Sequence, residues 1–245
     1  MALNERQNEI LALLKEQKKA SVAKLAKTFY VSEATIRRDF VEMQALGLIE
    51  RSHGGAFLPE NSEEMSLFFR IERNALEKKQ TATKALPHIP SFKSVFIDSS
   101  STVLALVNLM DFSNKTVFTN NLQTALQLSK QPNVTLILLG GTVQYNTNSS
   151  TGIWTARQLN DFAFDLMISS CAAVIDGNSY ERSLDQKEIK KIAFERSQKR
   201  ILLIDHTKFQ SHGAYRLTEL ENYDAVITNS KPPIELKDRN INFIY

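Results

Sequence analysis

Residues 32–58 read SEATIRRDFVEMQALGLIERSHGGAFL, and the organisation of the chain can be worked out from this stretch. Ser32 is a favourable helix N-cap and Gly47 a favourable helix end, so the first half predicts a helix that reaches about residue 46. Two short extended runs follow, 48–51 and 56–58, and the Gly-Gly pair between them predicts a tight hairpin. The apolar residues that recur at helical spacing form the core side of the helix: Ile36, Phe40, Met43 and Leu46.

The opposite side of this helix is small and polar in its first half and carries two arginines. Small residues let a backbone approach DNA closely, and arginine donates hydrogen bonds to guanine edges or to phosphates. The same composition suits an ordinary solvent-exposed helix, so by itself this side leaves both interpretations open. The candidate DNA contacts in the helix are Ser32, Ala34, Thr35, Arg37 and Arg38.

Two more helices precede this stretch. Apolar residues at helical spacing predict one helix over about residues 4–17, and Ser21 is a plausible N-cap for a second helix that ends near residue 29. Three helices followed by a hairpin make a winged helix-turn-helix, whose wing lies near the phosphate backbone or the minor groove. The candidate contacts in the wing are Arg51, His53 and Gly54.

Bulk composition restricts the class of protein without identifying it. The 245 residues carry a net charge of +3, and residues 1–60, with nine Lys/Arg and eight Asp/Glu, account for only +1 of it. Charge alone therefore does not mark a nucleic-acid-binding protein. The single Cys171 excludes an internal disulfide framework. No apolar run approaches the roughly 18 residues that a membrane span needs, and no signal peptide is evident, so we expect a cytoplasmic protein without a membrane partner.

Beyond residue 58 the sequence pattern changes twice. Polar residues 59–64 suggest a linker, and residues 66–86 predict one connecting helix that ends before Pro87. From residue 93 onward, short apolar runs alternate with helical stretches, which predicts a three-layer α/β domain with a mostly parallel sheet. The expected strands are 94–98, 116–119, 134–139, 165–169, 200–205, 224–228 and 241–245, and the expected helices are 102–110, 122–130, 153–160 and 184–197. We thus expect three segments: a DNA-binding domain (1–58), a linker with its helix (59–92) and a ligand-binding domain (93–245).

Polar residues follow several of the predicted strands. Ligands of open parallel sheets bind outside the carboxyl ends of the strands, where these residues would meet. Hydroxyls and free amides at such ends suit a phosphate group, carboxylates accept from sugar hydroxyls, and a lysine offers a charge to phosphate. Each loop alone is more simply a helix cap, but together the loops favour a site for a polyol phosphate. The candidates are Asp98, Ser99, Ser100, Ser101, Thr102, Thr119, Asn120, Gly140, Gly141, Asp205 and Lys208.

These motifs resemble those of the DeoR-type bacterial transcription regulators along nearly the whole chain. The similar stretches are RQNEILALLKE, VSEATIRRDFVEMQALGLIER, RSHGGAFL, VFIDSSST, VFTNNL, LILLGGTVQYNTNSSTG and ILLIDHTKF. The resemblance implies that residues 32–38 read operator DNA. It also implies a C-terminal sensor domain, similar to ribose-5-phosphate isomerase, that binds a phosphorylated sugar and modulates DNA binding. Repression is the more usual outcome in this family.

The chain departs from the family pattern at three places in the sensor domain. Ser100 stands where the family usually has glycine, and Gln186-Lys187 stands where it usually has Glu-Ala. Late in the chain, a run that is usually Asp-Ser-Ser-Lys reads Asp205-His206-Thr207-Lys208. A serine side chain in place of glycine narrows or reshapes the first loop.

Two other classes of protein are alternatives to a transcription regulator. A sugar-phosphate isomerase with an added DNA-binding module would need a positioned carboxylate base, but no pair of carboxylates has a distinctive spacing. A purely architectural DNA-binding protein would have no use for the α/β domain. We therefore predict a regulator, not an enzyme, with no cofactor and no bound metal. It acts as a homo-oligomer, a dimer or tetramer, because one recognition helix reads only a half-site of double-stranded operator DNA.

Overall fold

The computed structural model describes residues 3–58 and 66–245, apart from the side chain of Lys15. The chain divides into two compact units, Met1–Glu72 and Arg73–Tyr245. The segment that the sequence assigns to a linker and helix, 59–92, is thus shared between the units. The linker prediction itself, residues 59–64, lies outside the described residues.

The first unit is a small helical domain with a three-stranded antiparallel sheet. Its strands lie in the order β1-β3-β2, so β3 pairs with both β1 and the other wing strand β2. The three predicted helices and the hairpin are present, and β1 is an addition that the sequence did not suggest. The elements are α1 (Glu5–Gln17), β1 (Lys19–Ser21), α2 (Val22–Thr28), α3 (Glu33–Ala45), β2 (Glu50–Ser52), β3 (Gly55–Phe57) and α4 (Leu67–Glu72).

Side-chain caps fix where the helices of this unit begin. Asn4 and Gln7 form a capping box at the start of α1, each side chain bonding to the backbone of the other. Ser21 and Ser32 accept hydrogen bonds from backbone N–H groups in the first turns of α2 and α3. All three helices pack on one core, which includes Ile10, Leu14, Leu25, Ile36, Phe40 and Met43.

The single connecting helix predicted for residues 66–86 is wrong, because the structure has two helices there. Between α4 and α5 (Ala75–Ala85), Asn74 adopts a left-handed conformation with φ 54°, which ends one helix and starts another. Phe69 of α4 is buried in the core of the first unit, whereas α5 packs on the sheet of the second. The two halves of the segment therefore bury their apolar residues in different cores.

The second unit is built on a seven-stranded sheet in which every neighbouring pair is parallel. The order is β15-β14-β12-β9-β4-β5-β6, which confirms the predicted α/β class and all seven strands expected for the sheet. These strands are β4 (Ser94–Ile97), β5 (Thr116–Thr119), β6 (Thr135–Leu138), β9 (Phe164–Ser169), β12 (Ser197–Ile204), β14 (Ala225–Thr228) and β15 (Phe243–Ile244).

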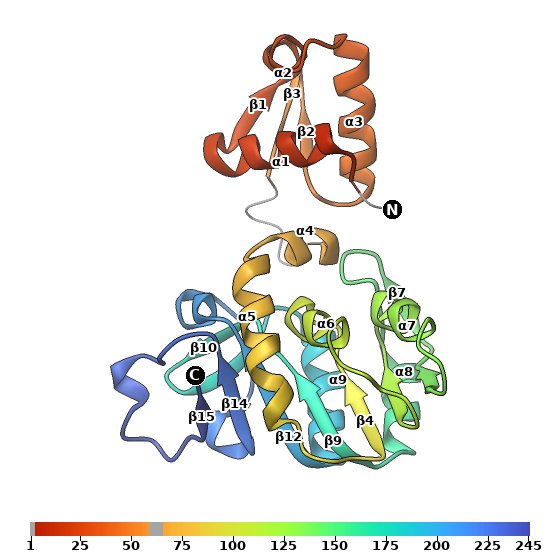
Figure 1. The fold of residues 1–245 in the computed structure, drawn as a ribbon, viewed down its shortest axis with the longest axis vertical. Coiled ribbons are helices and arrows are strands. Elements are labelled where there is room, and N and C mark those ends of the chain that lie inside the picture. The colour runs from red at the N-terminus through yellow and green to blue at the C-terminus, as the bar shows by residue number, and fades with distance from the viewer. Residues whose placement is uncertain (1–2, 59–65) are drawn as a thin grey trace. The chain divides into compact units, whose positions relative to one another are not determined.

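Helices cover both faces of this sheet. The helix α5 packs against α6 (Ser101–Val107) and α6 against α7 (Leu122–Leu128), while α8 (Ile153–Asn160) packs against α9 (Leu184–Glu195). In Figure 1, α5 and α6 lie in front of the sheet and α9 lies behind it. The first strand of this sheet along the chain, β4, lies in its middle. The chain then forms β5 and β6 on one side of β4 and returns to form β9 on the other side. The strand order therefore reverses between β4 and β9, which is where open α/β sheets usually bind ligands.

Five short strands lie outside the main sheet, and the sequence predicted none of them. A hairpin, β7 (Thr142–Gln144) and β8 (Ser149–Thr151), follows β6. A second antiparallel sheet comprises β10 (Ala173–Ile175), β11 (Asn178–Glu181) and β13 (Tyr215–Glu219). Both pieces follow strands of the main sheet at their carboxyl ends and so cover that edge. Among the described helices, no one is long and apolar enough to cross a bilayer.

Candidate functional site

Helix α3 has one side buried and one side facing solvent, as the sequence indicated. Ile36, Phe40 and Met43 are at most 1% exposed, whereas Ala34, Arg37 and Arg38 are exposed. Ser32 also contacts the Thr35 hydroxyl, with 2.9 Å between their Oγ and Oγ1 atoms. The first turn of α3 therefore presents small and polar groups beside two arginines.

The two arginines of α3 differ in their partners. An Arg37 Nη2 atom lies 2.7 Å from Glu33 Oε2, four residues earlier on the same helix. Arg38 makes no hydrogen bond or ion pair with any residue that the structure describes. Since Arg38 is exposed, its guanidinium can bind a base edge or a phosphate without breaking an internal contact.

An ion pair beneath this surface fixes α3 against α1. The Asp39 carboxylate accepts from Arg6 Nε at 2.6 Å, from Arg6 Nη2 at 3.1 Å and from Gln7 Nε2 at 3.3 Å. The hydrogen bond to Asp39 raises the pKa of the Arg6 guanidinium, and burial opposes it only in part. The sequence pattern alone did not predict this ion pair for Asp39. The available signal was its position, three residues after Ile36 on the apolar side, where an acid needs a partner.

The wing turns at Ser52-His53-Gly54-Gly55, and the two glycines serve different purposes. Gly54 has a positive φ of 81°, as a tight turn requires, and its carbonyl accepts from the Val22 amide at the start of α2. A Cβ atom on Gly55 would lie 2.6 Å from the carbonyl oxygen of Ala20, so Gly55 allows β3 to approach β1. Arg51 and His53 are exposed.

In the second unit, Asp98 follows β4 at the point where the strand order reverses. Its Oδ1 accepts from the Ser100 amide at 3.0 Å, and its Oδ2 accepts from the Ser170 amide at 3.0 Å. The Lys190 Nζ atom also lies 3.0 Å from Oδ2, and Asp98 is 1% exposed. Asp98 therefore holds the ends of β4 and β9 together, and its oxygens are already engaged by groups of the chain.

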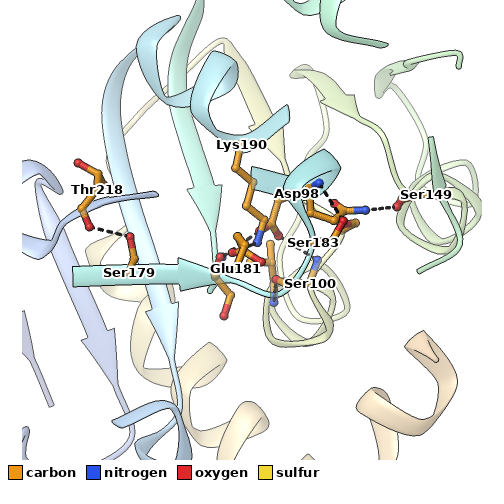
Figure 2. A network of polar contacts seen from close by, with 12 residues as sticks. Asp98, Ser100, Ser149, Ser179, Glu181, Ser183, Lys190 and Thr218 are labelled. Atoms are coloured by element: carbon orange, nitrogen blue, oxygen red, sulfur yellow. Dashed lines mark hydrogen bonds and ion pairs between the residues drawn. The ribbon is translucent and has the colours of Figure 1, made fainter. Parts of the chain in front are cut away.

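Lys190 joins Asp98 to a second buried carboxylate (Figure 2). Its Nζ atom donates to Glu181 Oε1 at 2.7 Å and to the carbonyl oxygen of Ser170 at 2.8 Å. Burial by itself lowers the pKa of Lys190, but the two facing carboxylates outweigh it and raise that pKa above its ordinary value. Burial raises the pKa of Glu181, and the charge of Lys190 opposes that rise. Glu181 and Lys190 were not among the predicted site residues.

Gln186 forms a polar bridge beside this cluster. Its Oε1 atom accepts from the Ser99 hydroxyl at 2.9 Å, and its Nε2 atom donates to Ser149 Oγ at 2.8 Å. The bridge thus connects the loop after β4 with the hairpin strand β8. Gln186 and Lys190 are four residues apart and both 4% exposed, so one side of α9 carries both groups toward the strand ends. The sequence does contain a signal for this site: Gln186 and Lys190 are polar residues at helical spacing beside the apolar Ile189 and Ala193.

The other predicted residues of the first two loops mainly hold local structure. Ser100 caps α6 by accepting from the Val103 amide at 3.2 Å, and Ser101 and Thr102 are buried in the first turn. Thr119 accepts from the Asn121 amide at 3.1 Å. Asn120 donates from Nδ2 to the carbonyl oxygen of Ser150. These contacts tie the ends of β4 and β5 to the hairpin that covers them.

Gly140 and Gly141 lie farther from the centre of the sheet, after its edge strand β6. The Gly140 carbonyl accepts from Thr155 Oγ1 at 2.7 Å. Gly141 has φ 151°, and a Cβ atom there would lie 2.7 Å from the carbonyl oxygen of Thr151. These glycines thus allow the hairpin and α8 to pack closely, which is a structural role.

Asp205 and Lys208 follow β12, two strands away from β4. Asp205 caps the short helix over His206–Gln210, accepting with Oδ1 from the Thr207 amide at 3.1 Å and from the Thr207 hydroxyl. Lys208 lies in this short helix, which packs against β10 at the carboxyl ends of the strands. The structure therefore groups these two residues with Asp98 at one edge of the sheet.

Several buried oxygen atoms at this edge have no hydrogen-bond partner in the part of the chain that the structure describes. They end four different strands of the sheet: Asn120 Oδ1 after β5, Ser169 Oγ on β9, Asp205 Oδ2 after β12 and Thr228 Oγ1 on β14. Buried polar atoms are nearly always hydrogen-bonded, so a row of unpartnered ones is informative. Within the same residues, no group of three or more His, Cys, Asp or Glu side chains could hold a metal ion.

The chain matches two family models, one for each unit. The DeoR-like helix-turn-helix domain matches residues 6–62, and the DeoR C-terminal sensor domain matches residues 73–230. The chain is 36% identical to the HTH-type transcriptional regulator GolR of Listeria innocua over 93% of this chain and 91% of that protein. It is 32% identical to the glycerol-3-phosphate regulon repressor of Escherichia coli, over 96% and 94% respectively.

Similarity to solved structures is more distant. A D-ribose-5-phosphate isomerase in complex with phospho-erythronic acid matches 54% of this chain and 52% of that one, with 18% identity and a TM-score of 0.39. The full-length relatives have the names of regulators and not of enzymes, which confirms the prediction of a regulator. The chain belongs to the DeoR family of DNA-binding transcription regulators.

Proposed function

We propose that this regulator represses an operon of sugar catabolism and that a phosphorylated sugar modulates its binding to the operator. The proposal places the protein in the bacterial cytoplasm, where its operator is, and has it bind as a homodimer or homotetramer. The observation that carries the DNA-binding part is the exposed, unpaired Arg38 on a helix whose other side is held by a partly buried ion pair. An arginine without an internal partner on a fixed helix is well suited to read a base.

The effector part of the proposal rests on the row of unpartnered oxygens at the carboxyl edge of the sheet. Asn120 Oδ1 and Asp205 Oδ2 are acceptors, and a polyol presents several hydroxyl donors. Lys208, in the short helix that follows β12, supplies a positive charge near the same edge, which suits a phosphate group. Asp98, by contrast, is engaged by Lys190 and two backbone amides, so in this proposal it shapes the site and does not bind the sugar.

Operator binding is tested by titrating the DNA upstream of the regulator's own operon at fixed salt, with fluorescence anisotropy. Arg38→Ala should weaken binding by roughly 1–3 kcal/mol, which is about fivefold to 150-fold, if Arg38 contacts a base. Arg216→Ala is a matched control, since it removes an exposed arginine from the second unit and should leave the affinity unchanged. Equal operator affinity of the Arg38 variant and the wild type would show that Arg38 does not contact the operator.

Effector binding is tested with a thermal-shift screen of hexose, pentose and polyol phosphates. A compound that raises the melting temperature should also change operator affinity, and Lys208→Ala should lose that response while binding the operator normally. Lys187→Ala, a lysine paired with Glu188 on α9, is the control that should keep the response. The effector proposal fails if no sugar phosphate binds, or if the Lys208 variant responds as the wild type does.

A further inference from the structure

One part of the chain is almost free of charged side chains. Charged residues make up 23% of the sequence, yet between residues 116 and 156 Lys130 is the only one, and residues 131–156 contain no Asp, Glu, Lys, Arg or His. A folded surface normally carries charged residues of both signs. A long uncharged segment is therefore expected either in a core or in an interface.

The structure places this segment at one end of the main sheet and largely on its surface. It forms β5, α7, the edge strand β6, the β7–β8 hairpin and the start of α8. These elements lie together at one side of the second unit in Figure 1. Seven large apolar side chains of the segment are 37–65% exposed and define what we call the uncharged face: Leu122, Leu126, Leu138, Val143, Tyr145, Ile153 and Trp154.

Short contacts join the elements that carry these side chains. The Leu122 amide donates to the carbonyl oxygen of Asn148 at 2.8 Å, which links the start of α7 to the hairpin. Val143 pairs with Ser150 in the hairpin, and α8 starts two residues after β8 ends. The backbones of α7, the hairpin and α8 are thus neighbours at this end of the sheet.

The edge strand β6 lacks the usual protection of an exposed edge. Edge strands are usually blunted by lysine, proline or a bulge, because their free backbone groups invite another strand. The strand reads Thr-Leu-Ile-Leu, pairs with β5 on one side, and has Leu138 43% exposed. At the opposite edge, β15 has only two residues. Tyr145 in the hairpin and Trp154 on α8 are exposed as well. We expect an apolar surface of this kind to be buried against a partner.

The absence of charge favours a second copy of the chain as that cover. In a two-fold contact the same patch meets itself, so a charged residue near the axis would face its own copy. A patch without charge avoids this repulsion and is complementary to itself. The arginine next to it, Arg157, lies over the Trp154 ring with its Cζ 5.4 Å from the centroid, a position typical of an interface rim. The seven side chains expose roughly 700 Å² together, close to the roughly 800 Å² that each partner buries in a standard interface.

We infer that two copies of the chain associate through the uncharged face, with β6 at its centre. This inference rests on the proposed binding of an operator by paired protomers, and it adds the surface that pairs them. Trp154 and Tyr145 supply the large side chains that dominate interface energetics. The contact holds the second units together and leaves each α3 helix free to read its own half-site.

The test is the mass of the full-length protein in solution, measured by sedimentation velocity at micromolar concentration. The wild type should sediment as a dimer or a larger even oligomer. Leu138→Lys and Trp154→Glu each place two like charges at the contact, so each should raise the dissociation constant at least tenfold and shift the protein toward monomer. Ile234→Lys, at a position 77% exposed and outside the face, is the matched control and should keep the wild-type mass.

Two results would overturn the inference: a monomeric wild type, or variants that keep the wild-type mass while circular dichroism shows them folded. Should either variant fail to fold, Tyr145→Glu, 65% exposed in the hairpin region, replaces it with the same expectation. Dissociated variants should still bind a single half-site, with lower affinity for the whole operator. If the variants dissociate but the wild type binds no operator, the proposed function is refuted and the inferred interface is supported.

Discussion

Replacing Lys190 by methionine tests whether the buried ion cluster holds the sensor unit together. The Nζ atom of Lys190 contacts Asp98, Glu181 and the Ser170 carbonyl at 2.7–3.0 Å, and all of these groups are screened from solvent. Methionine keeps the length and shape of the lysine stem but leaves two carboxylates buried without a cation. Removing one partner of a buried ion pair costs about 3–5 kcal/mol, whereas an exposed pair contributes less than about 1 kcal/mol.

The free energy of unfolding can be measured in urea from tryptophan fluorescence, since the only tryptophan, Trp154, lies in the second unit. For a unit of this size, a loss of about 3–5 kcal/mol corresponds to a decrease of roughly 6–20 °C in Tm. Lys191→Met is the control, because it makes the same change one residue along α9 at an exposed position, and it should cost about 0.5 kcal/mol or less.

A second variant separates the charge from the packing. Glu181→Gln combined with Lys190→Met removes one of the stranded carboxylates, so the double variant should be more stable than Lys190→Met alone. The cost in the single variant should also shrink as the pH falls from about 8 to about 5. The charge of Lys190 lowers the pKa of Glu181, so removing Lys190 raises that pKa further above its unfolded-state value than in the wild type. The folded variant therefore binds the Glu181 proton more tightly than the folded wild type does, and lowering the pH stabilises the variant by more. A loss below about 1 kcal/mol, or no rescue by Glu181→Gln, would refute the reasoning.

Three further predictions concern single groups. Asp39→Asn should lower the stability of the first unit by about 1–3 kcal/mol, measured by thermal unfolding, because it removes the charge that Arg6 pairs with; a change near zero would mean that the pair contributes nothing. Backbone amides of Ser94 and Lys93 lower the pKa of Asp165, so its stabilisation is present above about pH 4 and is lost as the pH falls through that lowered value; Asp165→Asn should therefore be less stable than the wild type at pH 7 but equally stable in strong acid, and a constant difference would contradict this. Burial raises the pKa of Cys171 to about 12, so Ellman's reagent should label it only as fast as the protein unfolds; rapid labelling of the folded protein would contradict its burial.

Much of the fold could be predicted from the sequence because its periodicities are strong. The central strands of the main sheet contain apolar runs that are buried on both faces, as in β4, β9 and the second half of β12, and this leaves little ambiguity. Two of the five short strands outside the main sheet read NSYE and YRLTE, with few apolar residues and no clear alternation. The other three have only three residues each, which is too few to show a periodicity. The break at Asn74 was missed because the segment is helical on both sides of it, and only packing against two cores separates the halves.

The sequence predicted a site at the carboxyl edge of the sheet, and this site remains a prediction. Position after a strand brought Asp98, Asn120 and Asp205 into consideration, and the structure groups them there. Glu181 and Lys190 lie on a short strand and in a helix interior, so no rule based on strand ends selects them. What makes Asp98 a structural group is its pairing with Lys190, 92 residues later in the chain, which only the fold brings about.

The contact between Arg6 and Asp39 has a consequence for how such a regulator can be switched. Because this ion pair and the shared core hold α3 against α1, we expect the two helices to move together and the tilt of α3 to be set within the first unit. We therefore expect an effector to change which operators the protein binds by altering the separation between the DNA-binding domains of two protomers. The structure of each domain should stay the same. Operators with an altered spacer would then mimic or oppose the effector, whereas changes within a half-site would weaken binding to the same extent with and without it.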